Sequence, residues 1–297
     1  AVGSQAGMSV TTGTNNTLIG GLAGDAITTA TNNTAVGLNS LGANTTGGQN
    51  VAVGDNALAA NTTAAYNTAL GTSTLQLNTT GTRNVATGAF SLTANTTGDG
   101  NVAMGYQALK SNTTASNNTA IGDQALEFNT TGIDNNAFGQ GALAATTTGT
   151  NNVAMGRLAG TTNTTGANNT AIGHVALRMN TTGGSNTAVG SQALDANTTA
   201  DHNTAVGTGA LSADTLGQAN VAIGSGALQT QNFTSSTDSY NVGIGRLAGG
   251  AITTGVQNTL IGGLAGDAIT TGNYNVGVGY TSLSANTTGE SNIAIGN

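Results

Sequence analysis

Cysteine, proline and tryptophan are absent from this chain of 297 residues, and charged residues make up only 6% of it. Without cysteine the chain forms no disulfide and no thiolate metal site. The net charge is −7 and only 5 residues are Lys or Arg. We therefore expect no nucleic-acid partner, because phosphate binding needs clustered basic side chains. No apolar run approaches the roughly 20 residues of a membrane-spanning helix, so we expect no membrane insertion in this segment.

What the chain has instead is a tandem repeat. A glycine recurs at every seventeenth position from Gly3 to Gly224, and after one longer step the same period resumes from Gly245 to Gly296. A fixed period of this kind is typical of a solenoid, in which each repeat stacks on its neighbours. We predict an all-β parallel β-solenoid of about 17 coils over 1–297, a single array with a four-residue insertion within 229–240. A hexapeptide-type left-handed helix is the alternative fold. Because the chain starts and stops inside repeats, we expect a slice of a longer fibre.

The three residues before each landmark glycine have the composition of a strand. Counting from that glycine, position −1 is aliphatic in nearly every repeat, position −3 is Thr, Val or Ile in every repeat but that of Asn136, and position −2 is usually Ala. Alternation along a strand puts −3 and −1 on one face and −2 on the other. We expect one face to be the core of the coil and the small alanine face to be covered by another polypeptide. The candidate trimer-facing residues are Ala35, Ala52, Ala103, Ala154, Ala188, Ala205 and Ala222.

The rest of the coil also follows the repeat. Positions +3 and +4 are usually Ala-Leu, as at Ala57-Leu58, and predict a second short strand. Where Gly replaces Leu at +4, position +7 often changes from Asn to an aliphatic residue, which predicts that +2, +4 and +7 share one core layer. Of 17 charged residues, 15 lie at +1, +5, +11 or +12, which we interpret as solvent-facing corners.

Position +13 is Asn in every coil that reaches it. Stacked coils would align these side chains in a column at about 4.8 Å spacing, so that amides hydrogen-bond along the stack. The predicted structural ladder is Asn33, Asn50, Asn67, Asn84, Asn101, Asn118, Asn135, Asn152, Asn169, Asn186, Asn203, Asn220, Asn241, Asn258, Asn275 and Asn292.

Asn-Val-Ala-Val-Gly at 50–54, Asn-Val-Ala-Met-Gly at 101–105 and Asn-Ile-Ala-Ile-Gly at 292–296 resemble the head repeats of YadA-like trimeric autotransporter adhesins. Similar repeats, with the Asn-Thr-Thr-Gly turn, occur in phage tail fibres and other bacterial surface fibres. The resemblance covers the whole chain. It implies a left-handed parallel β-roll, three chains packed side by side and attachment to surfaces. The YadA-type head repeat is shorter and lacks the full Asn-Thr-Thr-Gly excursion.

The titratable residues do not suggest catalysis. His174 and His202 occupy different corners and have no Cys or Ser nucleophile in phase, so we interpret them as surface residues. Asp195 and Asp201 are the nearest approach to the carboxylate pair of a glycan-cleaving spike, and we interpret them as solvated charges. The Gly-Gly-x-Gly-x-Asp pattern of calcium-binding repeats is missing. We expect no enzyme, no cofactor and no metal.

Two features remain open to a binding role. The paired threonines of Asn-Thr-Thr-Gly suggest an ice-binding surface, although alternation sends only one of each pair outward. The insertion is either a tolerated bulge or a contact loop, with Phe233, Asp238 and Tyr240 as candidate contact residues.

The sequence therefore predicts a structural, non-catalytic segment of an extracellular fibre, an adhesin head or shaft or a phage tail fibre, that attaches to surfaces through many weak contacts. The expected partners are further copies of the chain, as a homotrimer or longer filament, and a host surface, glycan or matrix receptor. A monomeric ice-binding solenoid and a glycan-binding or glycan-degrading tail spike are the alternatives.

Overall fold

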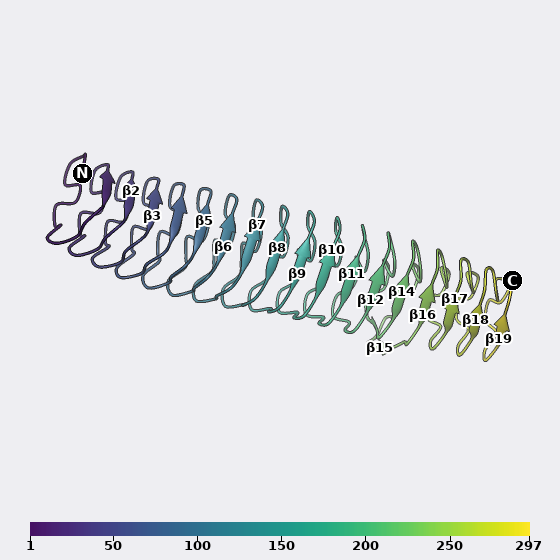
Figure 1. Cartoon of the computed structure of the whole chain (residues 1–297). Helices are drawn as coiled ribbons and strands as arrows, with labels where there is room; N and C mark the ends of the chain where they lie inside the picture. The colour runs from purple at the N-terminus through teal and green to yellow at the C-terminus, as the bar shows by residue number, and fades with distance from the viewer. The chain divides into compact units, whose positions relative to one another are not determined.

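A computed structural model describes all residues from 1 to 297. The chain forms two compact units, Ala1–Thr148 and Gly149–Asn297. Both are built only from strands and turns, and the strands lie side by side, with one three-residue strand in each coil (Figure 1). The predicted all-β parallel β-solenoid with a 17-residue repeat is confirmed.

The first unit contains eight strands: β1 (Thr17–Ile19), β2 (Thr34–Val36), β3 (Val51–Val53), β4 (Thr68–Leu70), β5 (Val85–Thr87), β6 (Val102–Met104), β7 (Thr119–Ile121) and β8 (Asn136–Phe138). The second unit contains β9 (Val153–Met155), β10 (Thr170–Ile172), β11 (Thr187–Val189), β12 (Thr204–Val206), β13 (Gly217–Gln218), β14 (Val221–Ile223), β15 (Thr237–Asp238), β16 (Val242–Ile244), β17 (Thr259–Ile261), β18 (Val276–Val278) and β19 (Ile293–Ile295). Only β13 and β15 depart from the three-residue pattern.

Neighbouring strands pair in parallel, and each residue faces its own equivalent in the next coil. Ala103 of β6 is opposite Ala120 of β7, which holds the same position one repeat further along. At the insertion the same register is kept across the longer step, because Val221 of β14 is opposite Val242 of β16. The four extra residues therefore leave the line of strands, and the ladder continues undisturbed.

The structure corrects the assignment of the two strand faces. All seven alanines proposed to face a trimer partner have 0% exposure. They lie inside their own coil, so their assignment to an outer contact face is wrong. The residues at −3 and −1 point outward instead, and Ile19, Val53 and Met104 are exposed by 37–44%. The physical reason is volume, because so short a coil has room for Ala but rarely for a larger aliphatic side chain in this layer.

The segment from +1 to +6 is a series of turns, so the predicted second short strand is wrong. Asn56 at +2 and Leu58 at +4 both have left-handed backbone conformations, with φ of 55° and 52°. Two left-handed residues separated by one residue fold the chain back tightly and place the Leu58 side chain inside the coil, fully buried. Each turn is held by the next coil, since Leu58 N donates to Thr74 O at 3.1 Å.

Glycine is required at the landmark position for two reasons. Gly190 has φ of 136°, which L residues rarely adopt, and a Cβ there would lie 2.6 Å from the carbonyl carbon of Gly207 in the next coil. The backbones of successive coils meet at these glycines. The constant spacing of the landmark glycines therefore marks a close approach of the backbone to the next coil.

The core is one leucine thick, and it adapts where that leucine is missing. Gly24 at +4 leaves a space that is filled by Leu18, which replaces the usual alanine at −2, and by Ile27 at +7. A Cβ on Gly24 would lie 2.7 Å from Ile27 Cδ1 and 2.8 Å from Leu18 Cδ2. Positions +4 and +7 thus share a core layer as expected. Leu22 at +2 is half-buried and is not part of this contact.

The same compensation links Leu260 to Gly277, its partner in the β17–β18 ladder. A Cβ on Gly277 would lie 3.2 Å from Leu260 Cδ2. We expect Gly277→Ala to lower the free energy of unfolding by about 1–3 kcal/mol through overpacking. In the Leu260→Ala background the same change should cost less, because the contact with Leu260 is gone and only the contact with Ser282 Oγ, 3.0 Å from the added Cβ, remains as tight. Urea unfolding of the four proteins of this double-mutant cycle measures the coupling, and equal costs in both backgrounds would contradict it.

Candidate functional site

The asparagines at +13 form a continuous hydrogen-bonded column within each unit. The backbone N–H of each one donates to Oδ1 of the asparagine one coil before, as from Asn50 to Asn33 at 2.9 Å. The side-chain amide donates to the carbonyl at +10 of the following coil, as from Asn50 Nδ2 to Ala64 O at 2.9 Å. The ladder residues named from the sequence lie in these columns, and most of them are buried.

A second ladder runs through the asparagines at +7. Asn61 Nδ2 donates to Asn44 Oδ1 at 3.0 Å and to Ala64 O at 3.0 Å. The carbonyl at +10 therefore receives amides from both columns, and it links the two sides of the coil interior. The repeat pattern predicted that +7 reaches a core layer, but it did not predict that the asparagines at +7 form a ladder. The fixed Asn at +7, lost where the aliphatic swap occurs, was the signal that could have revealed it.

The +7 ladder ends where its asparagine is replaced. In the first unit it runs from Asn44 to Asn129 and stops at Thr146, and in the second it runs from Asn163 to Asn197 and stops at Asp214. The last amide oxygen of each run, Oδ1 of Asn129 and of Asn197, is buried without a hydrogen-bond partner. Buried acceptors of this kind cost free energy that the intact rungs do not.

The outward side chains of the strands form an apolar face in each unit, here called the strand face and defined by positions −3 and −1. It is built mainly from Thr, Val, Ile, Leu and Met, and it carries no charged residue in any coil. In the first unit Leu70 and Val85 are 38% exposed, and in the second Met155 is 48% exposed. A continuous row of half-exposed aliphatic side chains of this kind is typical of a contact surface.

The charged residues line the corners of the coils, and several of them pair between neighbouring coils. Arg178 donates to both carboxylate oxygens of Asp195, at 2.9 and 3.1 Å. Lys110 lies 3.8 Å from Glu127, which is only 7% exposed. Position +5 is therefore a partly buried ridge, which corrects its assignment to a solvent-facing corner.

The two histidines lie at different corners of the coil, and each of the two carboxylates weighed for catalysis has another partner. His174 Nε2 is 3.5 Å from Arg157 Nη1, whereas His202 is exposed on another corner. Asp195 is paired with Arg178, and Asp201 accepts a hydrogen bond from Gly184 N at 2.6 Å. No group of three or more His, Asp or Glu side chains could hold a metal ion.

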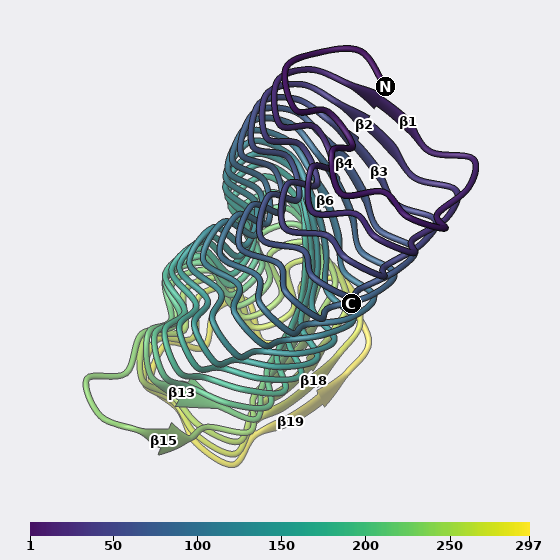
Figure 2. The ribbon, with the colours of Figure 1, turned by 90° about the vertical axis from the view of Figure 1, so that its left-hand side faces the viewer.

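The insertion forms an ordered side loop. Its short strand β15 pairs with β13, with Gly217 opposite Thr237, and the loop leading into β15 projects beyond the neighbouring coils (Figure 2). Of the three candidate contact residues, Asp238 and Tyr240 are exposed and lie together, with Tyr240 Oη 3.4 Å from Asp238 Oδ2. Phe233 is only 6% exposed, so it anchors the loop and is not a contact residue.

A buried carboxylate lies beneath this loop. Asp214 is 1% exposed and accepts hydrogen bonds from Gln231 Nε2 at 2.6 Å, Gly217 N at 3.0 Å and Phe233 N at 3.4 Å. Burial raises the pKa of the Asp214 carboxyl above its usual value, and these hydrogen bonds lower it by less. In the sequence Asp214 stands out only as one of the two charged residues outside the corner positions, and as an Asp in a column of Asn.

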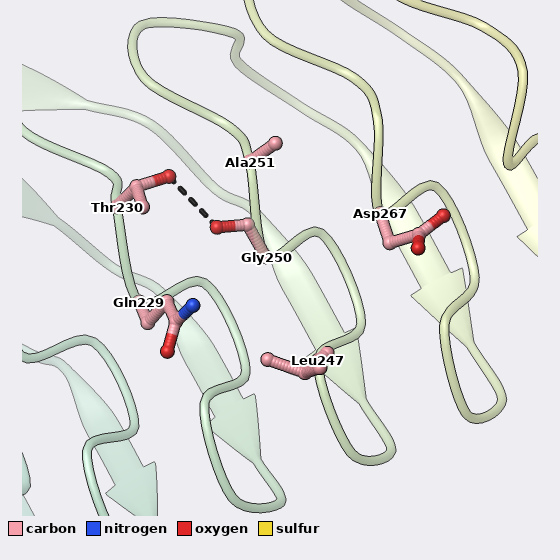
Figure 3. Close-up of a pocket in the computed structure, with 6 residues that line it drawn as sticks. All are labelled: Gln229, Thr230, Leu247, Gly250, Ala251 and Asp267. Atoms are coloured by element: carbon pink, nitrogen blue, oxygen red, sulfur yellow. Dashed lines mark hydrogen bonds between the residues drawn. The ribbon is translucent and has the colours of Figure 1, made fainter.

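A shallow cavity of about 300 Å³ opens beside the inserted coil (Figure 3). It exists because Gly250 has no side chain at +5, where the coils on either side carry Gln229 and Asp267. Thr230 donates its hydroxyl proton toward Gly250 O at 2.8 Å and Ile252 O at 2.9 Å, so this hydroxyl belongs to the backbone network. The cavity is mainly a gap in the ridge.

Comparison with known proteins adds no identification, since no family model and no curated protein matches the chain. The structure has no helix of the length and apolarity needed to cross a membrane.

The end of the first +7 ladder can be tested directly. Thr146 Oγ1 and Asn129 Oδ1 are both buried without partners. We expect Thr146→Asn to add one rung and raise the free energy of unfolding by about 1 kcal/mol, because the new amide would donate to Asn129 Oδ1. Asn112→Thr, which breaks an intact rung, should cost about 1–3 kcal/mol. Denaturant unfolding measures both, and a destabilising Thr146→Asn would show that the ladder has no room for another amide.

Proposed function

We propose that this chain is a structural, non-catalytic segment of an extracellular fibre that attaches to surfaces through repeated contacts. The observation that carries the proposal is the coil-to-coil hydrogen bonding, in which backbone, asparagine and threonine groups all bond to partners in the neighbouring coil. Such a column resists local opening, since removing one coil breaks every type of bond at once. The surface offers recurring contacts, whereas the titratable side chains are dispersed.

Self-association is supported by the strand face. Its aliphatic side chains leave a row of apolar surface exposed on each unit, and no charge interrupts it. Three chains packed side by side, as the resemblance to trimeric adhesins implies, would cover these faces around a shared axis. We therefore propose a homotrimer whose contact surface is the strand face.

The proposed external partners are a host surface, a glycan or a matrix receptor. The groups available for such contacts are the exposed threonines at +9 and the corner tyrosines, which are 50–59% exposed at Tyr66, Tyr106, Tyr240, Tyr274 and Tyr280. Each single contact of this kind is weak. A trimer presents each of them three times, so that attachment gains through avidity.

One observation favours ice binding as a second candidate. In the first unit Thr12, Thr29 and their equivalents form an exposed column at +9 that continues in every coil to Thr148. The neighbouring threonines at +8 donate their hydroxyl protons to the next coil, as from Thr45 Oγ1 to Thr62 O at 3.1 Å. The array is therefore one threonine wide. Thermal hysteresis without surface attachment would favour this candidate, and turnover of capsular polysaccharide would favour a glycan-degrading spike.

The trimer is tested by native mass. Light scattering behind a sizing column should give three times the 28.6 kDa of the chain. Val53→Lys combined with Met104→Lys on the strand face should reduce the mass to that of one chain, because burying these charges opposes assembly. Thr63→Lys with Thr114→Lys places the same charges in the exposed +9 column of the same two coils and should leave the mass unchanged. A monomeric wild-type chain, or equal effects of both variants, would overturn the proposed interface.

Surface attachment is tested with the same proteins. Labelled wild-type chain on a glycan array and on coatings of extracellular-matrix protein should dissociate at least about 100-fold more slowly than the variant with lysines on the strand face, because avidity is lost in the monomer. The +9 lysine variant is the matched control for added charge. Equal dissociation rates for the trimer and the monomer would contradict multivalent attachment, and no retention on either surface would contradict the adhesive role itself.

A further inference from the structure

The +7 ladder of the second unit ends at Asn197 and Asp214, where neither side chain has a proton to donate to the other. Asn180 Nδ2 donates to Asn163 Oδ1 at 2.8 Å, and Asn197 Nδ2 donates to Asn180 Oδ1 at 2.8 Å. The next rung is Asp214, which has no amide nitrogen with which to continue the column. Asn197 Oδ1 is accordingly buried without a hydrogen-bond partner.

An ionised Asp214 would make this junction worse, because a carboxylate only accepts hydrogen bonds. The hydrogen bonds that it accepts come from the other side, from the turn of its own coil and from the inserted coil, through Gly217, Gln231 and Phe233. Two acceptors on adjacent buried rungs, with no proton between them, carry the full penalty of lost solvation. A single proton on Asp214 removes that penalty.

We propose that Asp214 is a neutral carboxylic acid whose O–H donates to Asn197 Oδ1, and that loss of this proton loosens the inserted coil as a pH-sensitive joint. On ionisation the proton of Asp214 passes to water, and a carboxylate remains. The proposal does not depend on the proposed fibre function.

The inserted coil is the element that would respond, because Asp214 is bonded to its first part and Gln231 links that part to the point where the insertion ends. Gln231, at the start of the insertion, donates to Asp214 and accepts from Asn241 Nδ2 at 2.8 Å, where the insertion rejoins the ladder. Phe233 packs over Gly217, whose added Cβ would lie 2.8 Å from Phe233 Cδ2. Water reaches the carboxylate only if this cover opens, so ionisation favours the open loop.

No neighbouring charge explains the protonation. None of the hydrogen-bond partners of Asp214 is titratable, and burial is the main cause of its raised pKa. The titratable groups on the adjoining coils lie at the surface or make contacts of their own. They are Asp195, Asp201 and His202 on the preceding coil and Asp238 and Tyr240 in the insertion. The raised pKa means that the stabilisation from Asp214 is complete below its unfolded value of about 3.9 and is lost as the pH rises through the folded value.

The decisive measurement uses the unmodified chain. Infrared titration with ¹³C-labelled aspartate should show one carboxylic acid C=O band that persists to higher pH than the bands of all the other aspartates. Ionisation of all the aspartates together, with no band that outlasts the others, would overturn the proposal, whatever the behaviour of any variant.

Asp214→Asn then tests the joint, because its amide supplies a permanent donor to Asn197. The infrared band should vanish in this variant. In the wild type, hydrogen-exchange protection of residues 229–241 should fall at least about tenfold as the pH rises through the ionisation of this band, and in the variant that fall should disappear. Asp238→Asn removes an exposed carboxylate from the same loop and should behave like the wild type. An Asp214→Asn variant that is destabilised equally at every pH would show that the ionised carboxylate is the working form and would overturn the proposal.

Discussion

The structure depends on one constraint, which is that the peptide groups of each coil must find their partners in the coils on either side. The carbonyl at +10 shows how strict this is, because it accepts amides from both asparagine columns, as Gly47 O does from Asn33 and Asn44. A shift of one residue would break both bonds and turn every core side chain outward. The insertion respects the constraint by leaving the line of strands and rejoining it in register at Asn241, whose N–H donates to Asn220 Oδ1 at 3.0 Å.

Because the interior of the coil is narrow, the larger side chains lie on its outer surface. Ala, Leu and the two asparagines fill the coil, and no aromatic ring fits among them, so most of the few aromatic residues lie at the surface. The larger aliphatic residues of the strands are excluded for the same reason and form the strand face. Leu260 at the alanine position is tolerated beside Gly277, which shows how closely this volume is controlled. An apolar outer face is thus a consequence of the coil geometry, and it makes self-association the natural way to cover this surface.

The inserted coil is where the repeating chemistry changes. Asp214 and Gln231 replace two rungs of the +7 ladder, and Phe233 replaces an exposed threonine with a buried ring. These three changes lie in contact, so the loop is built into the core and is not an appended bulge. Function in repeat proteins often lies at such irregular points. Here the irregularity combines a projecting loop with a buried acid beneath it.

The sequence by itself determined the period, the parallel stacking, the position of the strand and the alignment of asparagines at +13, because these follow from spacing alone. It also determined that the side chain at −2 lies on the opposite face of the strand from those at −3 and −1, since side chains alternate along any strand. It did not decide which of these faces is inside. That choice depends on the direction in which the coil closes, and closure is set by the left-handed residues at +2 and +4, such as Asn56 and Leu58, which no local propensity predicts. Only the closed coil shows that Ala52 fits within it and Val53 does not. The second amide ladder and the buried Asp214 were likewise decided by tertiary structure, because a turn asparagine becomes a core residue only when the next coil covers it.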